Sequence, residues 1–318
     1  MNGERATQDL VLKDFSTDFS ELRRVLNKEL STISYVEARK TLEPQYWKAR
    51  TDLLLSLLLF GCSTAFAITN SNWFLTPLVA CMIGASVHRI SLFLHEGAHF
   101  NLAKSKVKND LLTDLLVSPF VVTSVAAYRP GHMLHHRNLG TGEDPERSYQ
   151  SPLNFRFLFT GFFGLRVLDV VKARESTSTN KTQTRNVVIP LIGITMYVSL
   201  LFMGIFTENW SFCVSLTIGV GCVFPLIGSL RQLLEHRAQA DDFLVMGEFP
   251  LTRNFPFWPL GWLFGAAGFN RHLLHHWDPG VSYTRLRDLE RLLAGSSAER
   301  VLEARNDSYY SVSRRIWR

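Results

Sequence analysis

The sequence predicts an all-α membrane protein, with four transmembrane helices in two hairpins and a helical cap on the cytoplasmic side. Three observations lead to this fold class. The 318 residues are 46% hydrophobic and only 19% charged, whereas a soluble chain carries about 25% charged residues. Four long apolar segments contain almost no charged residue. Eight of the ten histidines fall into three short clusters that follow such segments along the chain. The cap is therefore the expected place for polar chemistry.

The four apolar segments are residues 53–69, 73–87 (continuing to Leu94), 187–206 and 210–230. A helix needs about 20 apolar residues to cross the hydrocarbon core of a bilayer, so each segment predicts one span. The connections 70–72 and 207–209 are too short for anything but tight hairpins. Neither connection contains Lys or Arg, so the positive-inside rule places both termini and the central loop in the cytoplasm.

The predicted organisation has three parts: a cytoplasmic amphipathic N-terminal segment (1–52), a membrane domain (53–293) and a cytoplasmic C-terminal tail (294–318). The first fifty residues lack the early apolar stretch of a cleavable signal peptide. Residues 153–172, with Phe155, Phe159 and Phe162 on one helical stripe, and residues 249–269 are apolar but interrupted. They predict helices at the membrane surface or, equally, core helices of the cap. Residues 175–186 form a polar linker.

The clustered histidines share a spacing typical of one helix face. They are His95 and His99; His132, His135 and His136; and His272, His275 and His276. Residues three and four positions apart lie on the same side of a helix, so each cluster directs its imidazoles one way. The hairpin topology brings all three clusters to the same membrane face. Two copies of H-x-x-H-H beside H-x-x-x-H are far beyond chance, and they predict metal ligands.

Eight or nine imidazoles exceed the three or four ligands of a single zinc site, so the sequence predicts two metal ions. An all-nitrogen, nearly octahedral ligand set suits iron, although ligand type alone leaves zinc and copper open. Two irons reduced by an outside donor can use O2 to abstract hydrogen from an unactivated C–H bond. An apolar chain could reach such a centre from the bilayer, with its head group at the cytoplasmic surface.

Residues flanking the clusters carry a resemblance. Residues 128–132 (YRPGH) resemble Y-R-x-x-H, and residues 140–145 (GTGEDP) resemble G-T-x-x-D-P. Residues 275–279 (HHWDP), together with Tyr283, resemble H-H-x-x-P-x-x-x-Y. With the three histidine boxes, these motifs are similar to the integral-membrane fatty acid desaturase superfamily. The resemblance implies a di-iron, O2-dependent oxidoreductase that introduces a double bond into a lipid acyl chain.

The resemblance also implies a ninth ligand on the helix that continues the fourth span, four residues after an Asn. His236 fits the ligand, whereas Gln232 stands at the Asn position, which is a departure. His88 lies about 10 Å along the helix from His95, so it is expected to line the substrate cavity or bind water. Four carboxylates are candidates to orient the ligands, with surface charge as the alternative. They are Glu96, Asp144, Glu235 and Asp278.

The first fifty residues contain no histidine, so no fused heme domain is expected, and electrons come from a separate donor. A net charge of +6 would attract an acidic ferredoxin or cytochrome. The chain's modest length favours a bacterial inner membrane over the endoplasmic reticulum. The expected partners are thus lipid, membrane and electron donor, with no nucleic acid.

Three alternatives remain open. A hydroxylase or ketolase of a lipid or carotenoid in the same superfamily differs only in sub-ångström placement of the substrate. A zinc-dependent membrane hydrolase would use the same ligands with another metal. A metal transporter is disfavoured because the spans carry no ionisable residue except His88 and Arg89 near the end of the second.

Overall fold

The computed structural model describes residues 35–177, 187–237, 252–256 and 260–318. Within these ranges all regular structure is helical, apart from isolated bridge residues such as the paired Asn254 and Asn306. The chain forms two compact units. The membrane unit consists of residues 46–133 and 153–231, and the second unit consists of the described residues up to 45, 134–152 and those from 232 onward. The predicted all-α class is confirmed.

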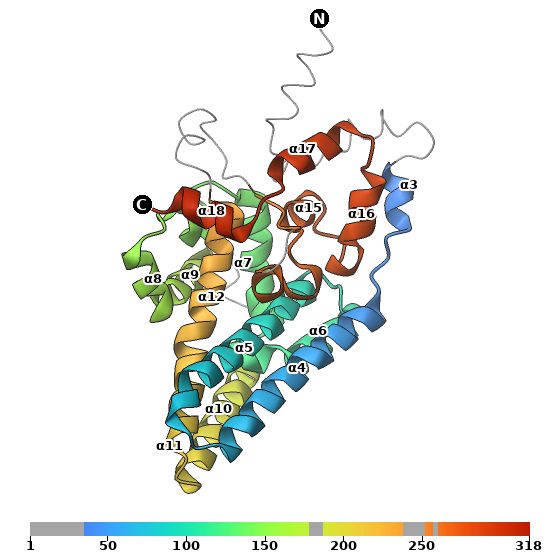
Figure 1. Cartoon of the computed structure of the whole chain (residues 1–318). Coiled ribbons are helices and arrows are strands. Elements are labelled where there is room, and N and C mark those ends of the chain that lie inside the picture. Colours follow the sequence, from blue (N-terminus) through green and yellow to red (C-terminus); the bar gives the residue numbers. More distant parts are fainter. Residues whose placement is uncertain (1–34, 178–186, 238–251, 257–259) are drawn as a thin grey trace, which may run out of the picture. The chain divides into compact units, whose positions relative to one another are not determined.

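Among the described residues, four helices are long and apolar enough to cross a membrane (Figure 1). They are α4 (Tyr46–Thr69), η1 with α5 (Trp73–Leu75, Thr76–Ala98), α10 (Val188–Phe206), and α11 with η4 and α12 (Trp210–Ile218, Gly219–Val223, Phe224–His236). These helices confirm the four predicted spans. The second and fourth extend beyond the apolar segments, to Ala98 and His236, because the helix continues through the polar residues that follow. The protein is therefore an integral membrane protein.

Helix α5 forms the core of the membrane unit, where it packs against α4, α11 and η4 (Figure 1). Of the 18 most apolar consecutive residues in the span that contains α5, 67% are buried, whereas in α10 only 17% are buried. Helix α10 instead exposes large apolar side chains such as Leu191, Phe202 and Phe206. Exposed apolar side chains on a membrane helix face lipid at no cost, whereas in water they would form an aggregation-prone patch.

Helices α5 and η4 approach closely through glycines. A Cβ atom at Gly84 would lie 2.6 Å from Val223, and one at Gly219 would lie 2.8 Å from the carbonyl oxygen of Ala80. Small residues allow such close backbone approach between membrane helices. Pro225 lacks an N–H for the carbonyl four residues earlier, and the wider π-type turn of η4 lies at this point.

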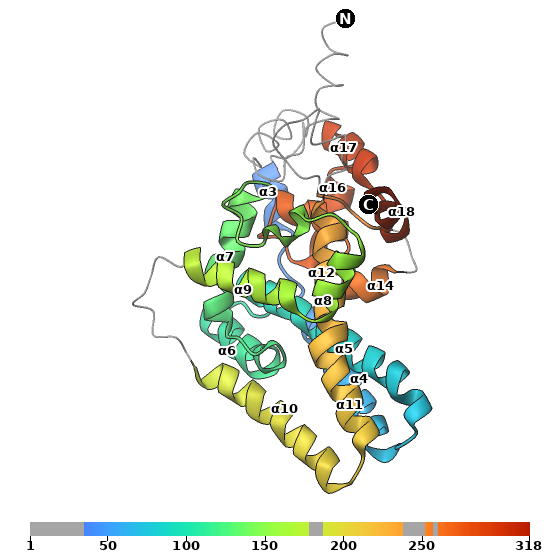
Figure 2. The same cartoon turned by 90° about the vertical axis from the view of Figure 1, so that its left-hand side faces the viewer.

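The two hairpins are joined at their connections. Helix α10 ends at Phe206 and α11 begins at Trp210, which confirms the predicted tight hairpin (Figure 2). The side-chain amide of Asn209, in this connection, donates to the carbonyl oxygens of Ala67 (3.0 Å) and Ile68 (2.9 Å) at the end of α4. Asn209 thus satisfies two carbonyl groups that a helix end leaves without partners.

The apolar segment 153–172 forms two helices, α8 (Phe155–Phe162) and α9 (Leu165–Thr177), separated at Gly164, whose φ is +68°. Phe155 and Phe159 are exposed, as expected for one apolar stripe, whereas Phe162 is only partly exposed. Of the segment 249–269, residues 249–251 and 257–259 lie outside the described residues, and the remainder contains α14 (Gly261–Phe264) and η5 (Ala266–Gly268). Most of the linker 175–186 also lies outside them.

The second unit contains short helices. They are α3 (Tyr35–Lys40), η3 (Arg147–Gln150), α14, η5, α15 (His272–Trp277), η6 (Tyr283–Arg285), α16 (Leu286–Leu292), α17 (Ser297–Arg305) and α18 (Tyr309–Ile316). Residues 294–318, expected as a tail, include α17 and α18, in which Val301, Val312 and Ile316 are buried. Two helices belong partly to each unit: α7 (Val125–Asn138) and α12.

Candidate metal centre

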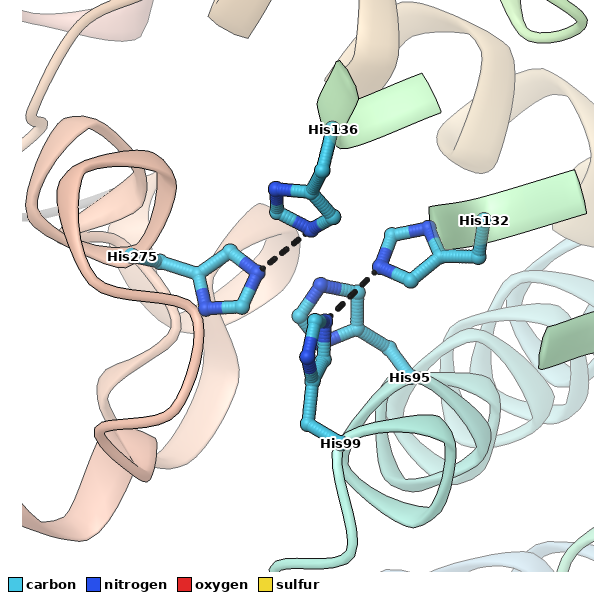
Figure 3. A group of neighbouring side chains, drawn as sticks. All are labelled: His95, His99, His132, His136 and His275. Carbon is cyan, nitrogen blue, oxygen red and sulfur yellow. Dashed lines mark hydrogen bonds between the residues drawn. The ribbon is translucent and has the colours of Figure 1, made fainter. Parts of the chain in front are cut away.

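The membrane unit brings three histidines together. His95 lies in the last turn of α5, His99 directly follows this helix, and His132 lies on α7. The Nε2 atoms of His99 and His132 are 3.0 Å apart (Figure 3), and the rings of His95 and His132 are 4.5 Å apart between centroids. One ring nitrogen from each of the three lies within 4.8 Å of the others. Three imidazoles that converge in this way can bind one metal ion.

Arg129 holds α7 against the end of α5. Its guanidinium donates to the carbonyl oxygens of Gly97 (3.0 Å) and Ala98 (2.9 Å) and pairs with Asp110 (2.5 Å). The last carbonyls of a helix lack partners and carry the negative end of the helix dipole, so a cation is stabilising there. Because Arg129 precedes His132 by three residues on α7, this contact positions His132 beside the end of α5. The motif resemblance identified Arg129 without revealing this role.

Gly97, inside the first histidine box, is required by the neighbouring helix α6 (Lys106–Leu116). A Cβ atom at Gly97 would lie 2.3 Å from Thr113 Oγ1. Asn109, which is fully buried, donates from its side-chain amide to the carbonyl oxygen of Gly97 (2.8 Å). Helix α6 therefore fixes the backbone between His95 and His99.

The second unit brings four histidines close together: His135 on α7, His236 at the end of α12, and His272 and His276 on α15. Ring nitrogens of His135, His236 and His276 lie within 4.8 Å of one another. All four are between 2% and 6% exposed. The Nε2 atom of His272 lies 2.8 Å from that of His236 and 3.2 Å from that of His276. Nitrogens about 2.1 Å from one ion at right angles are about 3 Å apart, so these distances fit ligands of a single metal.

His136 and His275 form a further pair within the second unit. Their Nε2 atoms are 3.1 Å apart (Figure 3), and His275 is 3% exposed. Both belong to histidine boxes, and every other box histidine also has an imidazole of another box histidine close by in its own unit.

His276 is in the protonation state that binds metals. Burial, followed by the positive charge that neighbouring histidines such as His136 and His272 would carry, lowers the pKa of His276 well below its usual value of 6.5. The imidazole is therefore neutral at pH 7, and a neutral imidazole is the form that donates an electron pair to a metal ion.

Asp144 orients His135. The Nδ1 atom of His135 lies 3.0 Å from both carboxylate oxygens of Asp144, which is 1% exposed. The hydroxyl of Tyr149 donates to the same carboxylate at 2.6 Å. Burial and the charge of Asp144 raise the pKa of Tyr149, which keeps this hydroxyl protonated. The carboxylate places the hydrogen of His135 on Nδ1 and leaves Nε2 for a metal.

Two of the other candidate carboxylates lie near imidazoles. Glu235 Oε2 is 3.5 Å from Nδ1 of His272, and Glu96 Oε1 is 3.7 Å from Nδ1 of His95. Glu235 is 2% exposed and Glu96 is fully buried. The contact of Glu96 is longer than a hydrogen bond, so its effect on His95 is electrostatic.

Asp278, the fourth candidate, binds α3. It accepts from Arg39 at Nε (2.5 Å) and from the hydroxyl of Tyr35 (3.1 Å). The carboxylate raises the pKa of Arg39, chiefly through this hydrogen bond. Asp278 therefore anchors the chain just after the third histidine box to a segment that precedes the first span. No local sequence pattern connects residues so far apart.

Gln232 and His88 occupy distinct environments. The amide oxygen of Gln232 accepts from Ser148 (2.5 Å), and its nitrogen donates to Glu146 (3.2 Å), so both amide atoms are bound by side chains near η3.

His88 is buried in α5, two turns before His95, and belongs to neither group of converging nitrogens among the described residues.

Asn254, which sequence reasoning missed, supports the third histidine box. Its fully buried side-chain oxygen accepts from the backbone N–H groups of Leu273 (3.0 Å) and Leu274 (3.4 Å) at the start of α15. Its backbone bonds Arg305 and Asp307 in the C-terminal segment. Asn254 thus caps the helix that carries His272, His275 and His276 from a distant part of the chain.

Replacing Asn254 by alanine is expected to lower the free energy of unfolding by about 1–3 kcal/mol. The buried amide of Leu274 loses its side-chain acceptor, and that of Leu273 keeps only its bond to the carbonyl oxygen of Arg253 (3.2 Å). Chemical unfolding in detergent micelles measures this change. Asn72→Ala is the control: Asn72 caps η1 in an exposed position, where water replaces the lost acceptor. Equal, small effects of the two substitutions would contradict the role given to Asn254.

Comparison with known proteins agrees with the geometry. The sequence profile of the family "Fatty acid desaturase" matches residues 71–305, which include all nine candidate ligands. The chain is also 24% identical over 241 residues to dihydrorhizobitoxine desaturase of Bradyrhizobium elkanii, an alignment that covers 70% of this chain and 68% of that protein. Because the family match spans well over half of the sequence, the chain belongs to the fatty acid desaturase family of membrane oxidoreductases.

Proposed function

We propose that this protein holds two iron ions and uses O2 and electrons from a separate donor to introduce a double bond into a lipid acyl chain. The observation that carries the proposal is the set of four buried, converging imidazoles in the second unit. This set would hold one ion: His135, His236, His272 and His276. His95, His99 and His132 of the membrane unit would hold the other ion, and His136 and His275 of the second unit are the remaining proposed ligands.

Helix α7 carries proposed ligands of both ions. His132 and His136 lie four residues apart on α7, so their side chains share one face of a continuous helix. Within its own unit, His132 meets His99, and His136 meets His275. His135, the residue before His136, would bind the ion held by His236, His272 and His276. One helix therefore carries ligands for both ions.

The residues present fit iron. The donors are all imidazole nitrogens, which suit first-row transition metals, and carboxylates such as Asp144 and Glu235 raise the basicity of the imidazoles. When bound, a reduced pair of irons would activate O2, which then supplies the oxidising power to remove hydrogen from an unactivated C–H bond. Burial of His135, His236, His272 and His276 excludes water from the ion that they would hold.

The apolar exposed faces of α4 and α10 support a substrate that arrives through the bilayer. Leu54 and Leu55 on α4 are more than half exposed, as are Leu191 and Phe202 on α10. An acyl chain has the same polarity as this surface. A second hydrogen taken from the adjacent carbon gives the alkene, and the position of the double bond follows from how deep the chain enters.

We place the histidine boxes on the cytoplasmic side. The connections 70–72 and 207–209 carry no Lys or Arg, and the positive-inside rule assigns such connections to the opposite side. A donor in the cytoplasm could then deliver electrons, and the net charge of +6 would attract an acidic one.

A second candidate follows from the relative in Bradyrhizobium elkanii. Its name assigns it to the desaturation of dihydrorhizobitoxine. The same metal chemistry would serve such a substrate in this chain, so the test must include this compound as well as lipids.

Lipid profiling of a host that makes the protein is the decisive experiment. We expect a new acyl double bond with the wild type and none with His135→Ala or His275→Ala, each of which removes one proposed ligand. Glu143→Gln, an exposed substitution, should retain the product. Immunoblots establish that all proteins reach the membrane in equal amounts.

Other products discriminate between the alternatives. A hydroxylated acyl chain would indicate a hydroxylase, and desaturation only of added dihydrorhizobitoxine would favour the second candidate. The same products from wild type and both histidine variants would overturn the catalytic assignment.

A further inference from the structure

The C-terminal helix α18 brings a tyrosine to the histidines of the second unit. Tyr309, the first residue of this helix, is 2% exposed, and its hydroxyl donates to Oε1 of Glu235 (3.1 Å). Buried Val312 and Ile316, three and seven residues later, anchor the same face of the helix. The family match ends at residue 305, so it assigns nothing to α18.

Glu235 connects Tyr309 to a candidate metal ligand. Its other carboxylate oxygen, Oε2, lies 3.5 Å from Nδ1 of His272. On the opposite edge of that imidazole, Nε2 lies 2.8 Å from Nε2 of His236. Tyr309, Glu235 and His272 therefore form a continuous chain of polar contacts that ends where a metal would be held.

We propose that Tyr309 is a positioning residue for the metal ion held by His135, His236, His272 and His276. Its hydroxyl fixes the Glu235 carboxylate, and the carboxylate keeps the hydrogen of His272 on Nδ1, so that Nε2 faces the ion. Ligands oriented by such outer partners bind metals more tightly. This inference rests on the proposed function, because it requires a metal ion at these histidines.

The same unit contains a second chain of this kind. Tyr149 donates to Asp144 (2.6 Å), and Asp144 contacts Nδ1 of His135 (3.0 Å). Two imidazoles of one group are thus each backed by a buried carboxylate and a buried tyrosine. The repetition argues for a shared purpose, which is to fix the ring orientation of the ligands.

The hydroxyl of Tyr309 is separable from the packing of its ring. The ring stacks on Phe255, with centroids 3.9 Å apart and planes inclined by 8°, and it also contacts Phe264 at 4.8 Å between centroids. Phenylalanine retains both contacts and removes only the hydrogen bond to Glu235. In this variant Oε1 of Glu235 loses the hydrogen bond from Tyr309, so the position of the buried carboxylate is less well fixed.

The test compares Tyr309→Phe with Tyr310→Phe in purified, full-length protein loaded with ferrous iron without oxygen. Tyr310 is the matched control because it is the next residue and is 64% exposed. Loss of iron to an excess of chelator is followed with time. In the wild type and in Tyr310→Phe we expect two ions that leave slowly. In Tyr309→Phe we expect one ion to leave about tenfold faster and the other to leave at the wild-type rate.

Selective loss of one ion is a readout that general destabilisation does not produce, and the thermal unfolding midpoint is measured alongside it. Glu235→Gln tests the same chain from its centre: it should release the same ion faster, and adding Tyr309→Phe to it should have little further effect. This second variant also decides the matter if Tyr309→Phe does not accumulate.

The possible failures are distinct. Equal iron loss from Tyr309→Phe, Tyr310→Phe and the wild type overturns the positioning role while the metal centre stands. A fully additive effect of Tyr309→Phe and Glu235→Gln also overturns it. A wild-type protein that retains no iron overturns the proposed function itself.

Discussion

His236→Gln is expected to leave the protein with one bound metal ion in place of two and to reduce product formation at least about 100-fold. A four-ligand site in a protein contributes about 10–16 kcal/mol of binding free energy, so one nitrogen carries roughly 3 kcal/mol, or about two orders of magnitude in affinity. Glutamine keeps a polar side chain of similar length at a position only 2% exposed. Metal analysis of the purified protein measures the first effect, and product analysis the second.

His88→Gln is the control for this substitution. His88 is also 2% exposed and also lies on a helix that the structure extends from a membrane span, but it stands apart from the converging nitrogens. The His88 variant should therefore retain both ions. Two ions in the His236 variant, or the loss of an ion from both variants alike, would contradict the assignment of His236 as the ninth ligand.

The spans and the histidine boxes were predictable because both are local patterns. An apolar segment of about twenty residues reports a membrane helix whatever surrounds it. H-x-x-H-H reports one helix face in the same way, since His272 and His276 need only an α-helical backbone to lie side by side. The apolar pattern alone did not give the ends of α5 and α12, because polar residues such as Glu96 and Glu235 end an apolar segment without ending the helix. The continuation of the fourth helix to His236 came from the family resemblance.

Three supporting residues could not be given their roles from the sequence, because their partners lie far away along the chain. Asn254 caps a helix that begins eighteen residues later, Arg129 binds carbonyls of the preceding span, and Tyr309 reaches Glu235 from 74 residues away. Asn254 and Tyr309 have no distinctive spacing, and the motif that contains Arg129 does not show which carbonyls this side chain binds. Only the folded backbone shows that its polar atoms meet a histidine-bearing helix.

Asp144 is the supporting residue whose loss should have the largest effect. Its carboxylate accepts from His135 Nδ1 (3.0 Å), the Tyr149 hydroxyl (2.6 Å) and the backbone N–H of Glu146 (2.7 Å), all in a place that is 1% exposed. Asp144→Asn keeps the size of the side chain but replaces one acceptor oxygen by a donor and removes the negative charge.

Asp144→Asn is expected to weaken metal binding 10- to 100-fold, because the imidazole of His135 loses the partner that fixes its hydrogen on Nδ1. The free energy of unfolding should fall by about 1.5–3 kcal/mol, the range for a hydrogen bond to a charged group. Glu143→Gln makes the same change of charge at the adjacent, exposed position, so it should alter neither quantity. Competition with a chelator measures the affinity, and chemical unfolding measures the stability. If the two variants bound metal equally well, Asp144 would be a structural residue of its loop alone, and the orientation of His135 would have to come from its place on α7.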